Sequence, residues 1–437
     1  MEKRKRGVRF FALSMAVLLV ASIFIWGFQT DWGRVRIERL TLNTPDGNKL
    51  STLIYIPNNA TEETPAPAAI IYHGRSNQAH SNDTWSMELA RRGFVVLSPD
   101  LNGGGESHVY GELPRGAVGV DGRVVQAMAT LQYALSLNII DHDQVNLIGY
   151  SMGTATATSV AAAMPDSVNS CLDVMGPFML QIRRALPTVA QLLNENDMDV
   201  GMVKADLDQY DFNFIGDKKA CRKVVSKELG LSETVKPGED TPVGKTSSFR
   251  YMEVNGAMHQ TGNISGETID AIIQYESDYN KVPRQLSIKN QAWIPQQIAS
   301  GVACVTMMFA LAALLDLLMQ TKFFDSIAIA RAPRKEQRGA KAWILDILFT
   351  FVIPAAVFIP VSTWGMEWFA GSKVLTSSNL NGIMLWLLLA FAVIGVIRMI
   401  VKAALRKKAG EPVALSDYCV QLKVTISSTG PMLEKPF

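Results

Sequence analysis

Four long runs of apolar residues limit what this 437-residue chain can fold into. The first covers residues 10–28, and the others lie near the opposite end of the chain at 298–315, 347–364 and 383–397; none contains a charged residue. A helix rises about 1.5 Å per residue, so about 20 residues cross the roughly 30 Å core of a bilayer. A buried helix of a soluble protein rarely stays uncharged on all faces for so long. The runs therefore predict four membrane-spanning helices.

The first run is predicted to stay attached as an anchor. A signal peptide has a shorter apolar region that ends in a small-residue cleavage site. Here the only small-residue pair, Ala21-Ser22, is followed by the apolar stretch 23–26, so cleavage there would leave an apolar N-terminus. A cleaved signal peptide is the alternative interpretation.

Basic residues predict the orientation of these helices. They precede the first run, crowd the segment 321–341 and follow the last run, whereas the loop 365–380 holds only Lys373. Basic-rich and basic-poor segments thus alternate as the positive-inside rule requires. We expect a multi-pass protein of the cell membrane with both termini in the cytoplasm and residues 31–291 on the extracytoplasmic side.

Residues 31–291 are predicted to form a water-soluble α/β domain, because strand-like and helix-like stretches alternate along them. The segment 177–208 interrupts this rhythm and is predicted to be a cap. The remaining divisions are an N-terminus with anchor helix at 1–30, three membrane helices at 292–403 and a cytoplasmic tail at 404–437. Strands are predicted at 34–42, 49–57, 68–72, 94–97, 145–148, 170–174, 212–215 and 249–254, and helices at 123–137 and 268–275.

The composition excludes several classes of protein. The chain has 42 Lys and Arg against 40 Asp and Glu, and this balance does not indicate a nucleic-acid partner. An apolar fraction of 48% excludes intrinsic disorder, and four cysteines are too few for a disulfide scaffold. Cys171 and Cys221 fall near neighbouring strand ends, where a disulfide is one possibility. No residue spacing predicts a metal site, and no cofactor is predicted.

The segment Gly149-Tyr150-Ser151-Met152-Gly153 carries the strongest chemical signal. It follows the strand-like VNLI and precedes the small-residue helix TATATSVAAA, which is the strand–turn–helix context of a nucleophile elbow. Small flanking residues allow a turn sharp enough to expose the serine hydroxyl. The pattern predicts that Ser151 is a nucleophile; the alternative is a Gly-rich turn whose serine caps the helix.

A serine nucleophile needs a base, and the chain has five histidines. The chain order nucleophile, acid, histidine requires a histidine after Ser151, and only His259 meets this condition. His259 follows the strand-like FRYMEV and a turn, which would place it at the same sheet edge as Ser151. The alternative is an ordinary surface histidine.

An oxyanion hole is predicted from two backbone amides. The chain turns just after the strand at 68–72, which can point the Arg75 N–H at the site. The Met152 N–H, at the start of the helix behind the nucleophile, would be the second donor.

The acid of the site stays open between two residues. It should lie between Ser151 and His259 and just after a strand, because its carboxylate orients the imidazole and stabilises the imidazolium. Asp217, in FNFIGDKKA, is the first choice, and Asp173, in SCLDVMGP, is the second.

These residues resemble the α/β-hydrolase family, and more narrowly its dienelactone-hydrolase-like and peptidase-like serine hydrolases. The resemblance covers about residues 34–277 and implies a mostly parallel eight-stranded sheet with a triad of Ser151, His259 and Asp217 or its neighbour. Family members often place the acid third after a glycine, where this chain has Lys219. The dienelactone hydrolases proper have cysteine as the nucleophile. The resemblance rests on TPDGNKL, IIYHG, RRGFVVLSPDLNGGGES, LIGYSMG and VNGAMH, in family order.

We therefore expect a membrane-anchored serine hydrolase that cleaves an ester, or an amide, through an acyl-enzyme. The substrate is expected to be a small-molecule or lipid acyl compound, because the predicted cap is rich in apolar residues between 178 and 193. The alternative is that these residues pack the cap onto the sheet. Two alternatives are an acyltransferase with the same triad and a non-catalytic membrane receptor or scaffold. The sequence identifies no protein partner for the C-terminal helices.

Overall fold

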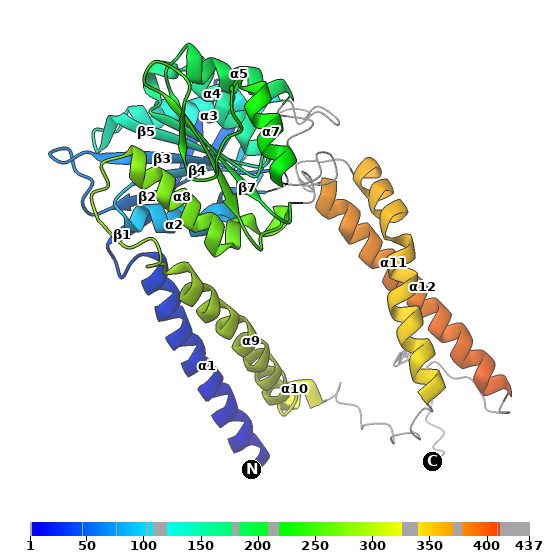
Figure 1. Cartoon of the computed structure of the whole chain (residues 1–437). Helices are drawn as coiled ribbons and strands as arrows, with labels where there is room; N and C mark the ends of the chain where they lie inside the picture. Colours follow the sequence, from blue (N-terminus) through cyan, green and yellow to red (C-terminus); the bar gives the residue numbers. More distant parts are fainter. Residues whose placement is uncertain are drawn as a thin grey trace. The chain divides into compact units, whose positions relative to one another are not determined.

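The computed structural model divides the chain into two units, 1–331 and 332–437, and each unit is described by itself. Figure 1 shows the α/β domain and the long helices. The structure describes residues 2–45, 47–75, 77–101, 104–107, 120–176, 183–208, 218–325, 340–369, 378–408 and 410.

The α/β domain is built on one nine-stranded sheet with the order β1-β2-β4-β3-β5-β6-β7-β9-β8. The five pairings from β4 to β9 are parallel, and the pairings of β1, β2 and β8 are antiparallel. This confirms the predicted mostly parallel sheet, although β7 and the short edge strand β8 were not among the predicted strands. The strand predicted at 212–215 lies outside the described residues. The strands are β1 (Val35–Asn43), β2 (Lys49–Pro57), β3 (Ala66–Tyr72), β4 (Val95–Pro99), β5 (Ile140–Tyr150), β6 (Ser170–Val174), β7 (Asp199–Ala205), β8 (Asp240–Pro242) and β9 (Ser248–Val254).

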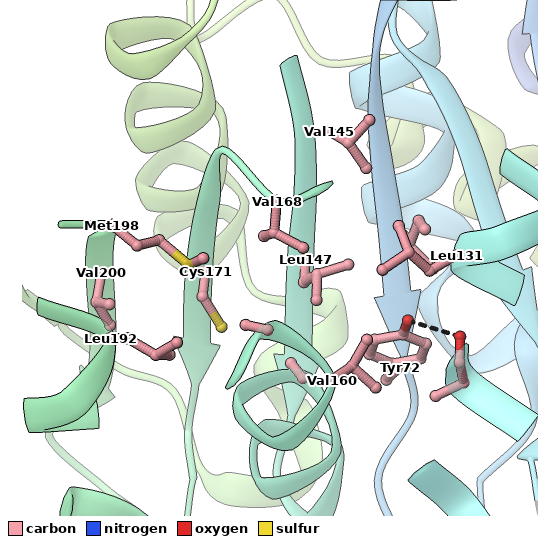
Figure 2. Close-up of a cluster of buried hydrophobic side chains, with 14 of the residues drawn as sticks. Tyr72, Leu131, Val145, Leu147, Val160, Val168, Cys171, Leu192, Met198 and Val200 are labelled. Atoms are coloured by element: carbon pink, nitrogen blue, oxygen red, sulfur yellow. Dashed lines mark hydrogen bonds between the residues drawn. The ribbon is translucent and has the colours of Figure 1, made fainter. Parts of the chain in front are cut away.

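Helices cover both faces of the sheet, because the central strands are apolar on both sides. Along β3, Ile70 belongs to the cluster beneath α3, α4, α5 and α7, and Ile71 belongs to the cluster beneath α2 and α8. Figure 2 shows Leu147, Val160 and Cys171 in the first cluster. Burial of each large aliphatic side chain contributes about 1.5–3 kcal/mol. The helices are α2 (Asp83–Arg91), α3 (Val120–Leu135), α4 (Met152–Ala163), α5 (Arg183–Asn194), α7 (Lys218–Glu228) and α8 (Gly266–Tyr279), with 3-10 helices η1 (Ala79–Asn82), η3 (Pro165–Ser167) and η5 (His259–Ile264).

The prediction of a cap over 177–208 is wrong for much of that segment. Residues 199–205 form β7, which pairs with β6 and β9 in the interior of the sheet. Helix α5 packs on the same core, where Val189, Leu192 and Leu193 are buried. For Leu192 and Leu193, the structure therefore agrees with the alternative prediction, in which these residues pack onto the sheet. Residues 177–182 lie outside the described part of the chain.

The two cysteines of the α/β domain do not form a disulfide. Cys171 on β6 and Cys221 on α7 are both buried, and each keeps a thiol that is not bonded to another cysteine. The chain therefore relies on core packing in this region.

Two long apolar helices adjoin the α/β domain in the first unit. Helix α1 (Glu2–Gln29) runs beside α9 (Trp293–Leu318) (Figure 1). Their rings meet where Phe10 lies edge-on to Phe309, with ring centroids 6.2 Å apart. The segments Arg4–Gln29 and Trp293–Leu318 are long and apolar enough to cross a membrane. Helix α9 is followed by the short α10 (Lys322–Asp325).

The second unit contains a pair of helices, α11 (Ala340–Trp368) and α12 (Ser378–Lys408). The segment Leu380–Val401 of α12 is the third that is long and apolar enough to cross a membrane. The described apolar part of α11, Thr350–Gly365, is shorter, so a span there stays a prediction. The Trp386 indole donates a hydrogen bond to the Pro354 carbonyl at 2.8 Å and so links the two helices.

A buried charge network joins α2 to the ends of α1 and α9. Glu88 is fully buried and accepts hydrogen bonds from Arg91 at 2.8 Å and Arg92 at 2.9 Å. Its other oxygen accepts the backbone amide of Ala292 at 2.6 Å, just before α9 begins. Arg91 also donates to Asp31 at 3.3 Å, in the turn that follows α1. Both apolar helices are therefore attached to one short helix of the α/β domain.

Candidate active site

Ser151 occupies a strained turn between β5 and α4. Its φ of 53° and ψ of −116° are rarely adopted by a residue with a side chain. The flanking glycines are needed for close packing: a β-carbon on Gly149 would lie 2.4 Å from the Thr154 Cα, and one on Gly153 would lie 2.0 Å from the Tyr72 carbonyl oxygen. The Gly-x-Ser-x-Gly pattern thus lets the turn sit tightly against β3 and expose the hydroxyl.

A continuous chain of hydrogen bonds runs from Ser151 through His259 to Asp208. The Ser151 Oγ lies 2.7 Å from His259 Nε2, and His259 Nδ1 lies 2.9 Å from Asp208 Oδ2. An ionised carboxylate only accepts hydrogen bonds, so Nδ1 carries the proton and Nε2 is left to accept from the serine. Asp208 is completely buried, and His259 is 8% exposed. This is the arrangement of a nucleophile, a base and an orienting acid.

The carboxylate beside His259 is not one that the sequence singled out. Asp208 follows β7 by three residues, as an acid just after a strand should. The first-choice residue, Asp217, lies outside the described residues. The strand signal before Asp208 was present in VGMV, but the polar residues Asp199 and Lys204 obscured it.

The second-choice acid, Asp173, lies on β6 and does not contact His259. It is 3% exposed, and its Oδ1 has no hydrogen-bond partner among the described residues. Burial raises the pKa of Asp173 to about 7, against the opposing charge of Lys204. The Lys204 ammonium donates a hydrogen bond to the carbonyl of Gly176. Asp173 and Lys204 therefore belong to a buried polar cluster that does not include His259.

Two aromatic side chains position His259. The Tyr150 ring is stacked on the imidazole, with centroids 5.9 Å apart and an interplanar angle of 22°. Its hydroxyl donates a hydrogen bond to the His259 backbone carbonyl. Burial, with the nearby charge of Asp208, raises the pKa of Tyr150, so the hydroxyl keeps its proton. Trp85 of α2 packs edge-on to Tyr150 at 5.4 Å.

The turn after β3 borders Ser151 on its other side. A β-carbon on Gly74 would lie 3.0 Å from the Ser151 Cβ, so this backbone is in direct contact with the nucleophile. His73 holds the turn: its Nε2 accepts the Leu101 amide at 2.9 Å, and its Nδ1 donates to the Gly74 carbonyl at 2.8 Å. Burial lowers the pKa of His73 to about 3, which keeps the imidazole neutral. Sequence reasoning had assigned His73 no such role.

The two predicted oxyanion donors lie on segments that border the nucleophile. Arg75 directly follows Gly74 and is exposed. Met152 is the first residue of α4, and the first amides of a helix have no partner within the helix. Among the described residues, no group of three or more His, Cys, Asp or Glu side chains could hold a metal ion.

One comparison with known proteins, a family match, agrees with this fold. Residues 67–214 match the family described as alpha/beta hydrolase fold. No curated protein matches the sequence. Similar solved structures include a predicted CIB-like hydrolase from Thermoplasma acidophilum, which is 14% identical, covers 56% of this chain and 98% of its own, and has a TM-score of 0.40. Dienelactone hydrolase from Anabaena variabilis is 15% identical, covers 56% of this chain and 97% of its own, and has a TM-score of 0.41.

Proposed function

We propose that this protein, which has the α/β-hydrolase fold, is a membrane-anchored serine hydrolase that cleaves carboxylic esters, with amides as the second substrate class. The observation that carries the proposal is the hydrogen-bonded chain from Ser151 through His259 to Asp208. Such a chain serves to raise the nucleophilicity of a hydroxyl, and a site without catalysis has no need of it. The strained backbone of Ser151 supports the same interpretation, because strain of this kind is typical of functional positions.

In the proposed reaction, the Ser151 hydroxyl attacks the carbonyl carbon of the substrate while His259 Nε2 takes its proton. The resulting oxyanion accepts hydrogen bonds from the Met152 and Arg75 amides. His259 then donates the proton to the leaving alcohol or amine as the acyl-enzyme forms. Water, deprotonated by His259, attacks the acyl-enzyme, and His259 then returns the proton to the Ser151 oxygen as the carboxylic acid is released. Asp208 stabilises the imidazolium in both halves of the reaction.

We also propose that α1 and α9 anchor the domain in the cell membrane and that the domain lies on the extracytoplasmic side. Both helices have the length and composition of membrane spans. Basic residues precede the α1 span and are concentrated after α9, which supports cytoplasmic ends for both helices. The contacts that hold α2 to Asp31 and Ala292 support a domain seated directly on these two helices.

A fluorophosphonate probe that does not cross membranes tests both proposals on intact cells. We expect covalent labelling of the wild-type protein and none of Ser151→Ala. Labelling only after lysis would reverse the proposed orientation. If active-site labelling fails in every preparation while the protein remains folded, the scaffold alternative replaces the hydrolase. An added alcohol acceptor distinguishes a transferase, because a transferase would form the transfer product in preference to the free acid.

A further inference from the structure

The α/β domain buries its large apolar side chains with few exceptions. Among the described residues between 33 and 293, only Leu207, Met258 and Ile264 are large apolar residues with exposed side chains. Their exposed fractions are 50%, 50% and 51%. Single exposed apolar residues are ordinary on protein surfaces, so the position of these three in the fold decides their meaning.

All three belong to the two segments that hold the base and the acid of the site. Leu207 directly precedes Asp208, and Met258 directly precedes His259. Ile264 ends η5, the short helix that His259 begins. The Leu207 amide donates a hydrogen bond to the Ala257 carbonyl at 3.2 Å, so the segments that carry Leu207 and Met258 lie side by side. We call these three residues the apolar rim.

The fold does not explain why the exposed residues of the rim are apolar. The Met258 amide donates a hydrogen bond to the Thr261 hydroxyl at 3.0 Å, and this holds the Met258 backbone at η5. The hydrogen bond does not depend on the side chain at position 258. The Leu207 backbone is likewise held through its amide. Polar side chains would leave these backbone bonds intact and would avoid contact between apolar surface and water. The three residues therefore leave apolar surface exposed on the segments that hold the base and the acid.

We propose that the apolar rim binds the acyl chain of the substrate and that the preferred substrates are esters of long-chain fatty acids. This inference rests on the proposed serine hydrolase function. It assigns the rim to the substrate because Met258 is bonded through the backbone to His259, whose Nε2 lies 2.7 Å from the Ser151 Oγ. In this proposal, a long acyl chain whose carbonyl reacts at Ser151 lies along the rim. A domain attached to two apolar helices also meets such substrates at the membrane surface.

The test compares p-nitrophenyl butyrate with p-nitrophenyl decanoate, both presented to the full-length protein in the same detergent micelles. We expect the wild type to prefer the decanoate by kcat/KM. In Leu207→Asn, Met258→Gln and Ile264→Asn, the decanoate-to-butyrate ratio should fall by about threefold to tenfold, since partly exposed contacts contribute less than an enclosed pocket. The matched controls Leu207→Met and Met258→Leu keep an apolar side chain and should keep the wild-type ratio.

Fluorophosphonate labelling separates the two levels of the proposal. Labelling that is equal in all rim variants shows that Ser151 is intact, so a changed ratio reports the acyl contact. If the wild type is labelled but cleaves butyrate as fast as decanoate, or if the polar variants leave the ratio unchanged, the rim does not bind the acyl chain. Absence of both labelling and ester cleavage in the wild type would instead contradict the hydrolase function itself.

Discussion

Asp208 Oδ2 lies 2.9 Å from His259 Nδ1, although 51 positions separate the two residues in the chain. The contact arises because β7 and β9 are parallel neighbours, so the segments that follow them meet at one edge of the sheet. Asp208 approaches from the end of β7, and His259 approaches from the turn after β9. The orientation of the base thus depends on the pairing of β7 with β9.

Replacement of this carboxylate should abolish the proposed ester hydrolysis. In Asp208→Asn, the amide no longer stabilises an imidazolium and favours the wrong tautomer, so kcat should fall by about 10³- to 10⁴-fold. Asp217→Asn, a matched change nine residues on, should leave kcat within about twofold of the wild type. Ester hydrolysis by both purified variants decides the identity of the acid. A large loss in Asp217→Asn with none in Asp208→Asn would show that the acid is Asp217.

Gly153, two residues after Ser151, should tolerate no side chain. Gly153→Ala places a β-carbon against the Tyr72 carbonyl oxygen, and both groups belong to packed elements that cannot move easily. We expect a loss of about 1–3 kcal/mol of unfolding free energy together with loss of probe labelling. Gly301→Ala is the control, because nothing lies within 4 Å of the corresponding β-carbon on α9. Thermal unfolding in detergent measures both variants, and equal midpoints would contradict the expectation.

The buried network at α2 predicts that a substitution of Glu88 lowers the stability of the domain by a large amount. Glu88→Gln keeps the size of the side chain but leaves Arg91 and Arg92 without their shared buried carboxylate. Removal of one partner of a buried ion pair costs about 3–5 kcal/mol. The exposed pair Lys236–Glu239, at 3.5 Å, offers a contrast: Glu239→Gln should leave the thermal midpoint unchanged. Equal midpoints for Glu88→Gln and the wild type would show that the network does not stabilise the domain.

Buried Glu276 should make the domain less stable as the pH rises. Burial raises its pKa to about 8, above the ordinary value of 4.5, with a smaller opposing effect of Asn280. Between these two pH values the unfolded chain has lost the proton and the folded chain keeps it, so stability falls as pH increases. Glu276→Gln removes this titration, and we expect its advantage over the wild type to grow by about 2–4 kcal/mol from pH 4.5 to pH 8. Urea unfolding at several pH values measures the difference; an advantage that stays constant contradicts the assignment.

Local patterns were sufficient to identify the elements around the nucleophile. VNLI, the glycines beside Ser151 and the small residues of α4 act together within one short stretch of chain, so their meaning can be read from the sequence. The strands at β2 and β6 were predicted with the bounds that the structure shows. Three of the four predicted apolar helices are long and apolar enough to cross a membrane, and composition alone was sufficient to predict them.

The features that the sequence did not reveal depend on partners far away in the chain. Lys204 made β7 look like a surface segment, yet it is buried because its ammonium reaches the Gly176 carbonyl. Without β7 in the predicted sheet, Asp208 had no strand to follow. Likewise, the role of Glu88 is defined by residues about 200 positions away, near Ala292. No periodicity or motif reports such contacts.

The attachment of the α/β domain leaves little room for reorientation. Only residues 30–34 lie between α1 and β1. At the start of α9, the Glu88 carboxylate accepts hydrogen bonds from the backbone amides of Ala292 and Trp293. A domain on one flexible linker sweeps a wide volume and samples many tilts. A domain held at two closely tied points keeps one tilt, so in a bilayer Ser151 would stand at a single height above the lipid. The distance from the membrane at which a substrate bond can react would then be set by the fold and not by motion of the domain.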